Sequence, residues 1–261
     1  MPLTLMTVHA HPDDECIATG GVMAQAAADG HRVVLVVATK GEHGEVDDGV
    51  LEEGEQLWQR RVQETKAAAD ILGAQRVEFL GYVDSGMIGT PENEAPESFW
   101  QADVNEAAER LAAILRDERA DILTIYDDNG GYGHPDHIQV HRVGMRAAEL
   151  AGVERVYQAT INRDHLIRGL RERATTMPAG VEMPDFENAP DFGVSEDRIT
   201  AAVDVSQWLD HKRRAMQAHA SQIGEQSFFL TMPQEGFAYA FGTEWFIRDG
   251  QAPGITETSL L

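Results

Sequence analysis

The alternation of short apolar segments with longer amphipathic segments constrains the fold of this chain more than any other feature. The apolar segments are rich in Val, Leu and Ile and have the length of strands, whereas the segments between them repeat with the period of a helix. Strands that alternate with helices build a mainly parallel sheet covered on both faces, so we expect a doubly wound α/β fold. Gly73 follows the second helical segment at a position typical of a C-cap. The predicted strands are residues 3–8, 32–38, 76–80, 121–126 and 155–158, and the predicted helices are residues 20–28, 55–72, 100–118 and 135–151.

The last hundred residues give a weaker signal. Residues 177–197 combine three prolines with many acidic residues, which predicts an irregular loop or lid over the core. Helical periodicity returns at residues 206–222, and the aromatic segment "FFLTMPQEGFAYAFGTEWFIR" (228–248) is expected to pack on the sheet, with a pocket wall as the alternative. We therefore expect a catalytic core at residues 1–160 and a C-terminal extension at residues 161–261 that completes the same domain and the pocket rim.

The charge balance limits the kinds of partner. Lys and Arg total 21 against 44 Asp and Glu, which gives a formal net charge of -23. Such a chain repels nucleic acid and anionic lipid surfaces, so neither is an expected partner. The sequence contains no apolar run of membrane-spanning length and no signal peptide at its start, which predicts a cytoplasmic protein. Cys16 is the only cysteine, so a metal site would have to use nitrogen and oxygen ligands.

Two polar motifs follow the first and fourth predicted strands. They are "HAHPDDE" (9–15) and "YGHPDH" (132–137). In a doubly wound sheet, the carboxyl ends of the first strand and of its neighbour on the other side meet at a switch point, where ligands bind. A catalytic metal asks for three His, Asp or Glu ligands and one open position, which His11, Asp14 and His137 would supply.

The remaining polar groups of the two motifs suit hydrolysis. Asp13 stays free in this scheme and would act as the general base. A protonated His134 would stabilise an oxyanion, with Asp136 holding its orientation or raising its basicity, and Tyr132 would donate a second hydrogen bond.

Several alternatives remain for individual residues. The first motif would also suit an acidic turn that caps the next helix. His137 and His141 are spaced to form a metal pair of their own, although no glutamate accompanies them as in HExxH. A nicotinamide site is disfavoured because no GxGxxG follows the first strand, whereas a binding protein ordered by its metal stays open. His9 is assigned to a buried hydrogen bond, Cys16 to the core, and His141 to a structural or supporting role. The other histidines are assigned to solvent or packing: His31, His43, His165, His211 and His219.

The two motifs, read with "DSGMIGT" (84–90), resemble those of the PIG-L or LmbE-like family of zinc-dependent N-deacetylases, and in particular the actinobacterial deacetylases of the mycothiol pathway. The resemblance covers residues 3 to about 160. It implies a Rossmann-like fold and hydrolysis of the N-acetyl group of a small glucosamine-type sugar. Zinc would then be held by His11, Asp14 and His137, with ferrous iron as the alternative, and the catalytic roles would fall to Asp13, His134, Asp136 and Tyr132.

The resemblance also implies that Glu15, Arg61 and Asp84 hold the sugar. An arginine on a helix and an aspartate after a strand equally suit a surface ion pair, so this alternative stays open. The acidic segment 182–197 and the aromatic segment depart from the family pattern, which leaves the physiological substrate and the oligomeric state open. Mycothiol-conjugate amidases are an alternative, although "CIAT" stands after the first motif where they tend to carry a lysine.

Overall fold

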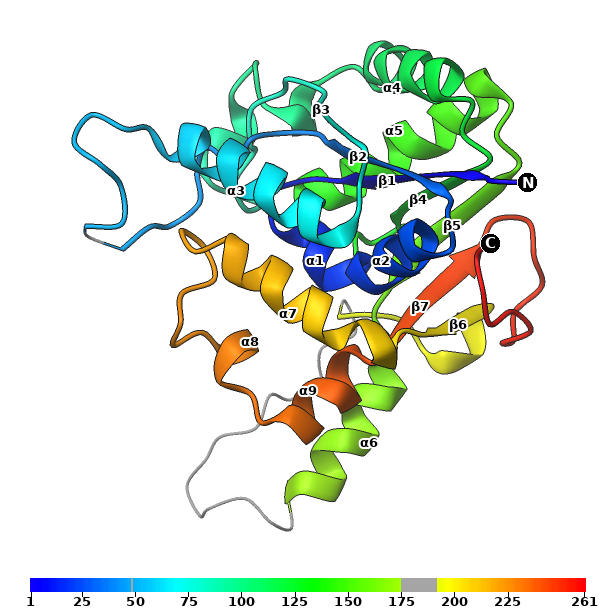
Figure 1. The fold of residues 1–261 in the computed structure, drawn as a ribbon. Helices are drawn as coiled ribbons and strands as arrows, with labels where there is room; N and C mark the ends of the chain where they lie inside the picture. The colour runs from blue at the N-terminus through cyan, green and yellow to red at the C-terminus, as the bar shows by residue number, and fades with distance from the viewer. Residues whose placement is uncertain (48, 175–191) are drawn as a thin grey trace.

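The computed structural model describes residues 1–47, 49–174 and 192–261, and its described strands form one mixed sheet (Figure 1). The strand order is β3-β2-β1-β4-β5-β7-β6, in which the first five strands of the chain are parallel and β7 runs antiparallel to both β5 and β6. The expected doubly wound, mainly parallel α/β fold is confirmed. The strands are β1 (Thr4–His9), β2 (Arg32–Val37), β3 (Arg76–Phe79), β4 (Ile122–Tyr126), β5 (Arg155–Thr160), β6 (Ala201–Asp204) and β7 (Thr243–Arg248).

Helices cover both faces of this sheet (Figure 1). One face carries α1 (Asp14–Ala18), α2 (Gly20–Ala28), α3 (Leu57–Leu72) and α7 (Leu209–Ala218), and the other carries α4 (Val104–Glu118) and α5 (Pro135–Ala151). Successive strand residues point to opposite faces, so Leu5 and Met6 enter two different hydrophobic clusters. Burial on both sides explains why the parallel strands are continuous apolar runs. The remaining helices, α6 (Arg163–Ala174), α8 (Phe228–Thr231) and α9 (Gln234–Phe241), lie beyond α7 in Figure 1.

The topology places the carboxyl ends of β1 and β4 side by side. β1 pairs with β2 on one edge and with β4 on the other, with Leu5 opposite both Val33 and Ile122. The connections that leave β1 and β4 therefore turn to opposite faces of the sheet and open a crevice between them. The two polar motifs lie on these connections.

The sequence predicted most core elements to within a few residues. Residues 20–28 and 135–151 are helical at the predicted bounds, and Gly73 ends α3 in the left-handed conformation, with φ 79°. The helix predicted at 100–118 begins later, at Val104, because Asp103 caps it by accepting hydrogen bonds from two N–H groups of its first turn. The helix predicted at 206–222 is shorter, since α7 ends at Ala218.

The structure contains elements that the sequence did not predict: α1 near the N-terminus, and α6, β6, α8, α9 and β7 in the C-terminal region. As expected, its aromatic segment packs on the sheet, with Phe246 of β7 fully buried and Phe237 2% exposed. Much of the acidic segment expected to form a loop or lid, residues 175–191, lies outside the described residues. None of the helices in the described ranges is long and apolar enough to cross a membrane.

A buried ion pair ties this region to the first helices. Lys212 Nζ lies 2.5 Å from Glu244 Oε1 and also donates to the carbonyl of Ile17 at 3.1 Å. The Glu244 carboxylate accepts the N–H groups of Gly21 and Val22 at the N-terminus of α2, at 2.7 and 2.8 Å. An anion is favoured at a helix N-terminus, so the pair joins α7, β7 and α2 at one point.

We expect Lys212→Met to lower the free energy of unfolding by about 3–5 kcal/mol, because it leaves the Glu244 charge buried without its cation. Urea unfolding measures this change. The matched control is Arg146→Met, which breaks a pair whose side chains are 44% and 66% exposed and should leave the unfolding midpoint almost unchanged. A loss below about 1 kcal/mol for Lys212→Met would contradict the anchoring role.

Candidate metal centre

The two motifs converge at the edge of the sheet, as expected. The ring centroids of His11 and His137 are 5.5 Å apart, and the ring of His134 lies 4.7 Å from the first and 5.1 Å from the second. One nitrogen of each ring lies within 4.8 Å of the others, and all three side chains are buried. Residues separated by more than 120 positions in the chain thus form one cluster.

The loop after β4 is shaped by its own hydrogen bonds. The Asp127 carboxylate accepts the N–H of Gly131 at 2.8 Å and the hydroxyl of Thr160 at 2.5 Å. Gly130 adopts φ 65°, and a Cβ at this position would lie 2.5 Å from Cβ of His137. Glycine is therefore required where the loop passes His137.

His137 presents an unpartnered nitrogen to the cluster. Its Nδ1 lies 3.1 Å from the carbonyl oxygen of Gly130, which can only accept, so Nδ1 carries the proton. The buried Nε2 then has a free lone pair and no hydrogen-bond partner among the described residues, and it lies 3.4 Å from Asp14 Oδ2. The ring of Tyr126 stacks on the imidazole at 4.2 Å. This arrangement is typical of a metal-ligating histidine.

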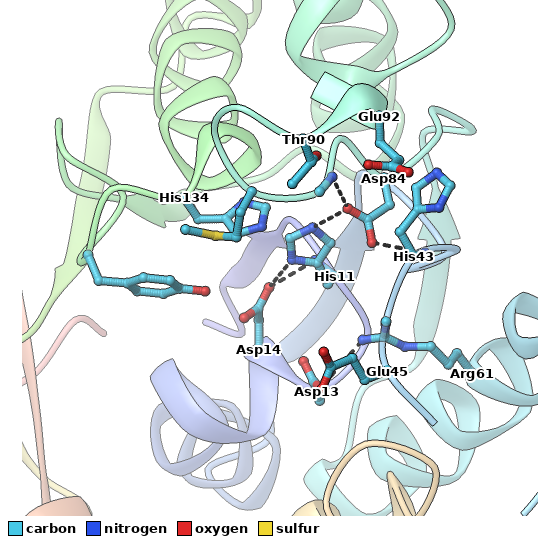
Figure 2. A pocket seen from close by; sticks show the side chains of 14 residues that line it. His11, Asp13, Asp14, His43, Glu45, Arg61, Asp84, Thr90, Glu92 and His134 are labelled. Carbon is cyan, nitrogen blue, oxygen red and sulfur yellow. Dashed lines mark hydrogen bonds and ion pairs between the residues drawn. The ribbon is translucent and has the colours of Figure 1, made fainter. Parts of the chain in front are cut away.

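His11 is oriented in the same way. Its Nε2 lies 3.1 Å from Asp136 Oδ2. The same nitrogen lies 3.5 Å from Asp84 Oδ1, while Nδ1 lies 3.4 Å from Asp14 Oδ2 (Figure 2). A proton on Nε2 leaves Nδ1 free to ligate. Burial opposes a charged ring, but the three carboxylates overcome it and raise the pKa of His11. Two nitrogens that face one carboxylate oxygen form a donor set that fits a divalent cation.

Asp136 was expected to hold the orientation of His134 or to raise its basicity. Its charge does raise the pKa of His134 against the larger opposing effect of burial, but its carboxylate makes its hydrogen bonds elsewhere. The Asp136 carboxylate is fully buried and accepts hydrogen bonds from His11 Nε2, from the Ser85 N–H at 2.9 Å and from the Ser85 hydroxyl. Only its backbone N–H reaches His134, at Nδ1 and 3.1 Å. The carboxylate therefore fixes His11, and Ser85 fixes the carboxylate.

His134 is a neutral hydrogen-bond donor rather than the expected imidazolium. Because its Nδ1 accepts the Asp136 N–H at the start of α5, the ring proton lies on Nε2. Burial, together with the neighbouring His11 and His137, lowers the pKa of His134 to about 4. Tyr132, which is 43% exposed, lies beside it with ring centroids 6.2 Å apart.

Asp13 has the least usual backbone of the site. It adopts φ 104° and ψ -28°, a conformation that costs a residue with a side chain about 1–3 kcal/mol. Its carboxylate lies 3.4 Å from Arg61 NH2 and lines the cavity. Burial raises the pKa of the Asp13 carboxyl to about 6 against the opposing charge of Arg61, and the charge of Asp14 adds to the increase.

Glu15 was expected to hold the sugar, but it lies behind the site and does not face the cavity. The side chain is fully buried and does not line the cavity. Its Oε1 lies 2.5 Å from His219 Nε2, and its Oε2 accepts the Asp13 N–H at 3.0 Å. Burial opposes a charged His219, but Glu15 raises its pKa. His219 was assigned to solvent or packing; it is buried, and its pair with Glu15 had no signal in the sequence.

The cavity next to the cluster has a volume of about 530 Å³ (Figure 2). Arg61 lines it but is only 3% exposed, so the surface ion pair considered for it is excluded. Its guanidinium donates to the carbonyls of Pro12 at 2.6 Å and Gly41 at 2.9 Å. Asp84 also lines the cavity and is 5% exposed. Four further polar side chains, none of them predicted for the site, line the same cavity: His43, Glu45, Thr90 and Glu92.

Comparison with known proteins gives consistent matches. Residues 6–148 match the family described as GlcNAc-PI de-N-acetylase, or PIG-L. A 1D-myo-inositol 2-acetamido-2-deoxy-alpha-D-glucopyranoside deacetylase from Acidothermus cellulolyticus is 45% identical over 262 residues, which covers 95% of this chain and 89% of the relative. The similarity therefore extends well past residue 160, where the motifs alone end.

Solved structures of similar proteins share the fold. An N,N'-diacetylchitobiose deacetylase from Pyrococcus horikoshii matches with a TM-score of 0.60 and 20% identity over 94% of this chain and 83% of that one. A 4-carboxy-2-hydroxymuconate hydratase from Pseudomonas putida matches with a TM-score of 0.59 and 21% identity, over 98% of each chain. Because one fold carries both activities, the side chains of the site have to decide the reaction.

We expect Asp136→Ala to weaken the affinity for Zn²⁺ about 10–100-fold, because His11 loses the acceptor that fixes its ring and its tautomer. Competition with a chromophoric chelator measures this affinity. Asp128→Ala is the matched control, since Asp128 lies in the same loop but its side chain is 59% exposed. Equal affinities for the two variants would show that Asp136 does not support the site.

Proposed function

Because this chain belongs to the PIG-L family of GlcNAc-PI de-N-acetylases, we propose that it hydrolyses the acetamide of a small sugar of the N-acetylglucosamine type. PIG-L deacetylases depend on a metal. The observation that carries the proposal is the buried His137 Nε2, which has no partner among the described residues and faces the same Asp14 oxygen as His11 Nδ1. A donor set of this kind beside the carboxylate of Asp13, which is not among the proposed ligands, suits metal-assisted hydrolysis.

The proposed ligands are His11, Asp14 and His137. Zn²⁺ is the preferred cation because two imidazoles and one carboxylate match its usual catalytic ligand set, and Fe²⁺ would be accepted by the same atoms. The third imidazole of the cluster, that of His134, is kept as a hydrogen-bond donor in this proposal because the Asp136 N–H already occupies its Nδ1.

A bound divalent cation would supply Lewis-acid polarisation to the water and to the acetyl carbonyl. The carboxylate of Asp13 takes the proton from the attacking water and later delivers it to the leaving nitrogen of the amine. The Nε2–H of His134 donates to the oxygen on which negative charge develops. Tyr132 adds a second donor at the mouth of the cavity, because burial and the charge of Asp14 raise its pKa and keep the phenol protonated.

The proposed substrate is an N-acetylglucosaminyl-inositol or a related free sugar, because the Acidothermus relative carries the name of such a deacetylase. Asp84 and Arg61 are the proposed sugar contacts. The net charge of -23 favours a free sugar over a phosphatidylinositol in an anionic membrane. A cavity of about 530 Å³ falls in the range of small-molecule sites.

The test is release of acetate from N-acetylglucosaminyl-inositol and from simpler N-acetylglucosaminides. We expect release that stops when a chelator removes the metal and returns when Zn²⁺ is added, because His11, Asp14 and His137 would have lost the ion they hold. Release from a mycothiol conjugate and not from the N-acetyl sugars would indicate an amidase. Absence of chelator-sensitive release from every amide tested would indicate a binding protein whose metal only orders its loops.

Three alanine variants separate the proposed roles. Asp13→Ala should lower kcat by about 10²–10⁴-fold with bound metal unchanged, because it removes only the base. Asp14→Ala should lose the metal, whereas His134→Ala should keep the metal and lose turnover. Elemental analysis of the purified variants, combined with the acetate assay, measures both quantities. Loss of metal from His134→Ala but not from Asp14→Ala would assign the third ligand to His134.

A further inference from the structure

A chain of buried contacts connects the end of α7 to the proposed base. His219 follows the last residue of α7, and its Nε2 lies 2.5 Å from Glu15 Oε1. The other oxygen of the same carboxylate accepts the backbone N–H of Asp13 at 3.0 Å. Glu15 and His219 have no exposed surface, so solvent does not compete for these bonds.

Asp13 needs such support because of its backbone. At φ 104° its peptide is held from three sides: Glu15 accepts its N–H, the N–H of Cys16 donates to its carbonyl at 3.2 Å, and Arg61 donates to the preceding carbonyl of Pro12 at 2.6 Å. The direction of the carboxylate depends on this backbone conformation. An unusual conformation persists only where its surroundings determine it.

His219 is itself well fixed. Its imidazole makes one hydrogen bond within the described residues, the bond to Glu15, and its Nδ1 has no partner there. Two residues after it, Ser221 donates through its N–H and its hydroxyl to the buried carboxylate of Glu64 on α3, at 2.9 and 2.6 Å. The imidazole is therefore held against Glu15 by the docking of α7.

We propose that His219 is a positioning residue for the deacetylation. By holding the Glu15 carboxylate, it keeps the backbone of Asp13 in its left-handed conformation, and this conformation directs the carboxylate of the base toward the substrate. This inference rests on the proposed function. It assigns a role to a residue that touches neither the substrate nor the ligand set, and it gives the C-terminal region a direct effect on the reaction.

The same atoms do not form a second metal site. One ligand atom each of Glu15, Cys16 and His219 lies within 4.8 Å of the others. However, Glu15 and His219 are already hydrogen-bonded to each other, and the thiol of Cys16 donates to the carbonyl of Asp13 at 2.8 Å. The two Glu15 oxygens, Nε2 of His219 and the Cys16 thiol therefore all have hydrogen-bond partners within this cluster and the Asp13 backbone.

The test compares His219→Gln with His219→Asn. The glutamine amide reaches the place of Nε2 and keeps a donor for Glu15, whereas asparagine is too short. We expect His219→Asn to lower kcat about 10–100-fold, with KM and bound metal within about twofold of the wild type, and His219→Gln to recover most of the turnover. The control is His211→Asn on α7, the helix that precedes His219; the His211 ring packs against Trp208, and this variant should leave turnover unchanged.

Turnover is measured on folded, metal-loaded protein, next to the wild type in the same acetate assay. A wild type without activity overturns the proposed function, whereas an active wild type with equal kcat for His219→Asn and His219→Gln overturns only the positioning role. If His219→Asn does not fold, Glu15→Gln carries the test, because an amide oxygen cannot serve both donors as the carboxylate does. Glu15→Gln should then lose turnover and keep its metal, and wild-type turnover in this variant overturns the inference.

Discussion

The site depends on a single carboxylate oxygen, Asp14 Oδ2, which lies 3.4 Å from one nitrogen of each of two imidazoles that come from distant parts of the chain. This contact forms only because β1 and β4 are neighbours and their connections leave toward opposite faces of the sheet. The rest of the site keeps these nitrogens aimed at the same point. The Asp136 carboxylate accepts a hydrogen bond from Nε2 of His11, and the Gly130 carbonyl accepts one from Nδ1 of His137.

Placing so many charged groups in a buried crevice is unfavourable unless each has a partner. In the structure, several charged groups around the cluster have such partners. Ser85 satisfies the Asp136 carboxylate, which in turn orients His11. Behind the first motif, His219 satisfies Glu15, and Lys212 satisfies Glu244. Among the described residues, His137 Nε2, Arg61 Nε and His219 Nδ1 are buried without a hydrogen-bond partner. His137 Nε2 has chemical meaning because it faces the same Asp14 oxygen as His11 Nδ1.

Much of the core and of the candidate cluster could be predicted from the sequence. The strands are continuous apolar runs because both faces are covered, and the helix at residues 135–151 begins with a proline and ends before a glycine. The two motifs were placed correctly at one edge because parallel strands share a polarity. The sequence did not identify the side-chain partners of Glu15 and Asp136. The family resemblance implied a sugar contact for Glu15, and the motif suggested His134 as the partner of Asp136, whereas the two carboxylates contact His219 and His11.

The sequence by itself determined the type of fold, the family and the residues that gather at the switch point, because these follow from local periodicity and from motifs only a few residues long. Only the tertiary structure decided which partner each polar group has. The proton on His134 lies on Nε2 because of a backbone N–H, and Glu15, which accepts the Asp13 N–H, pairs with a histidine more than 200 residues away in the chain. The pairing of Glu15 with His219 depends on how α7 packs against α1 and α3. Such long-range contacts cannot be recognised from the periodicity of the sequence.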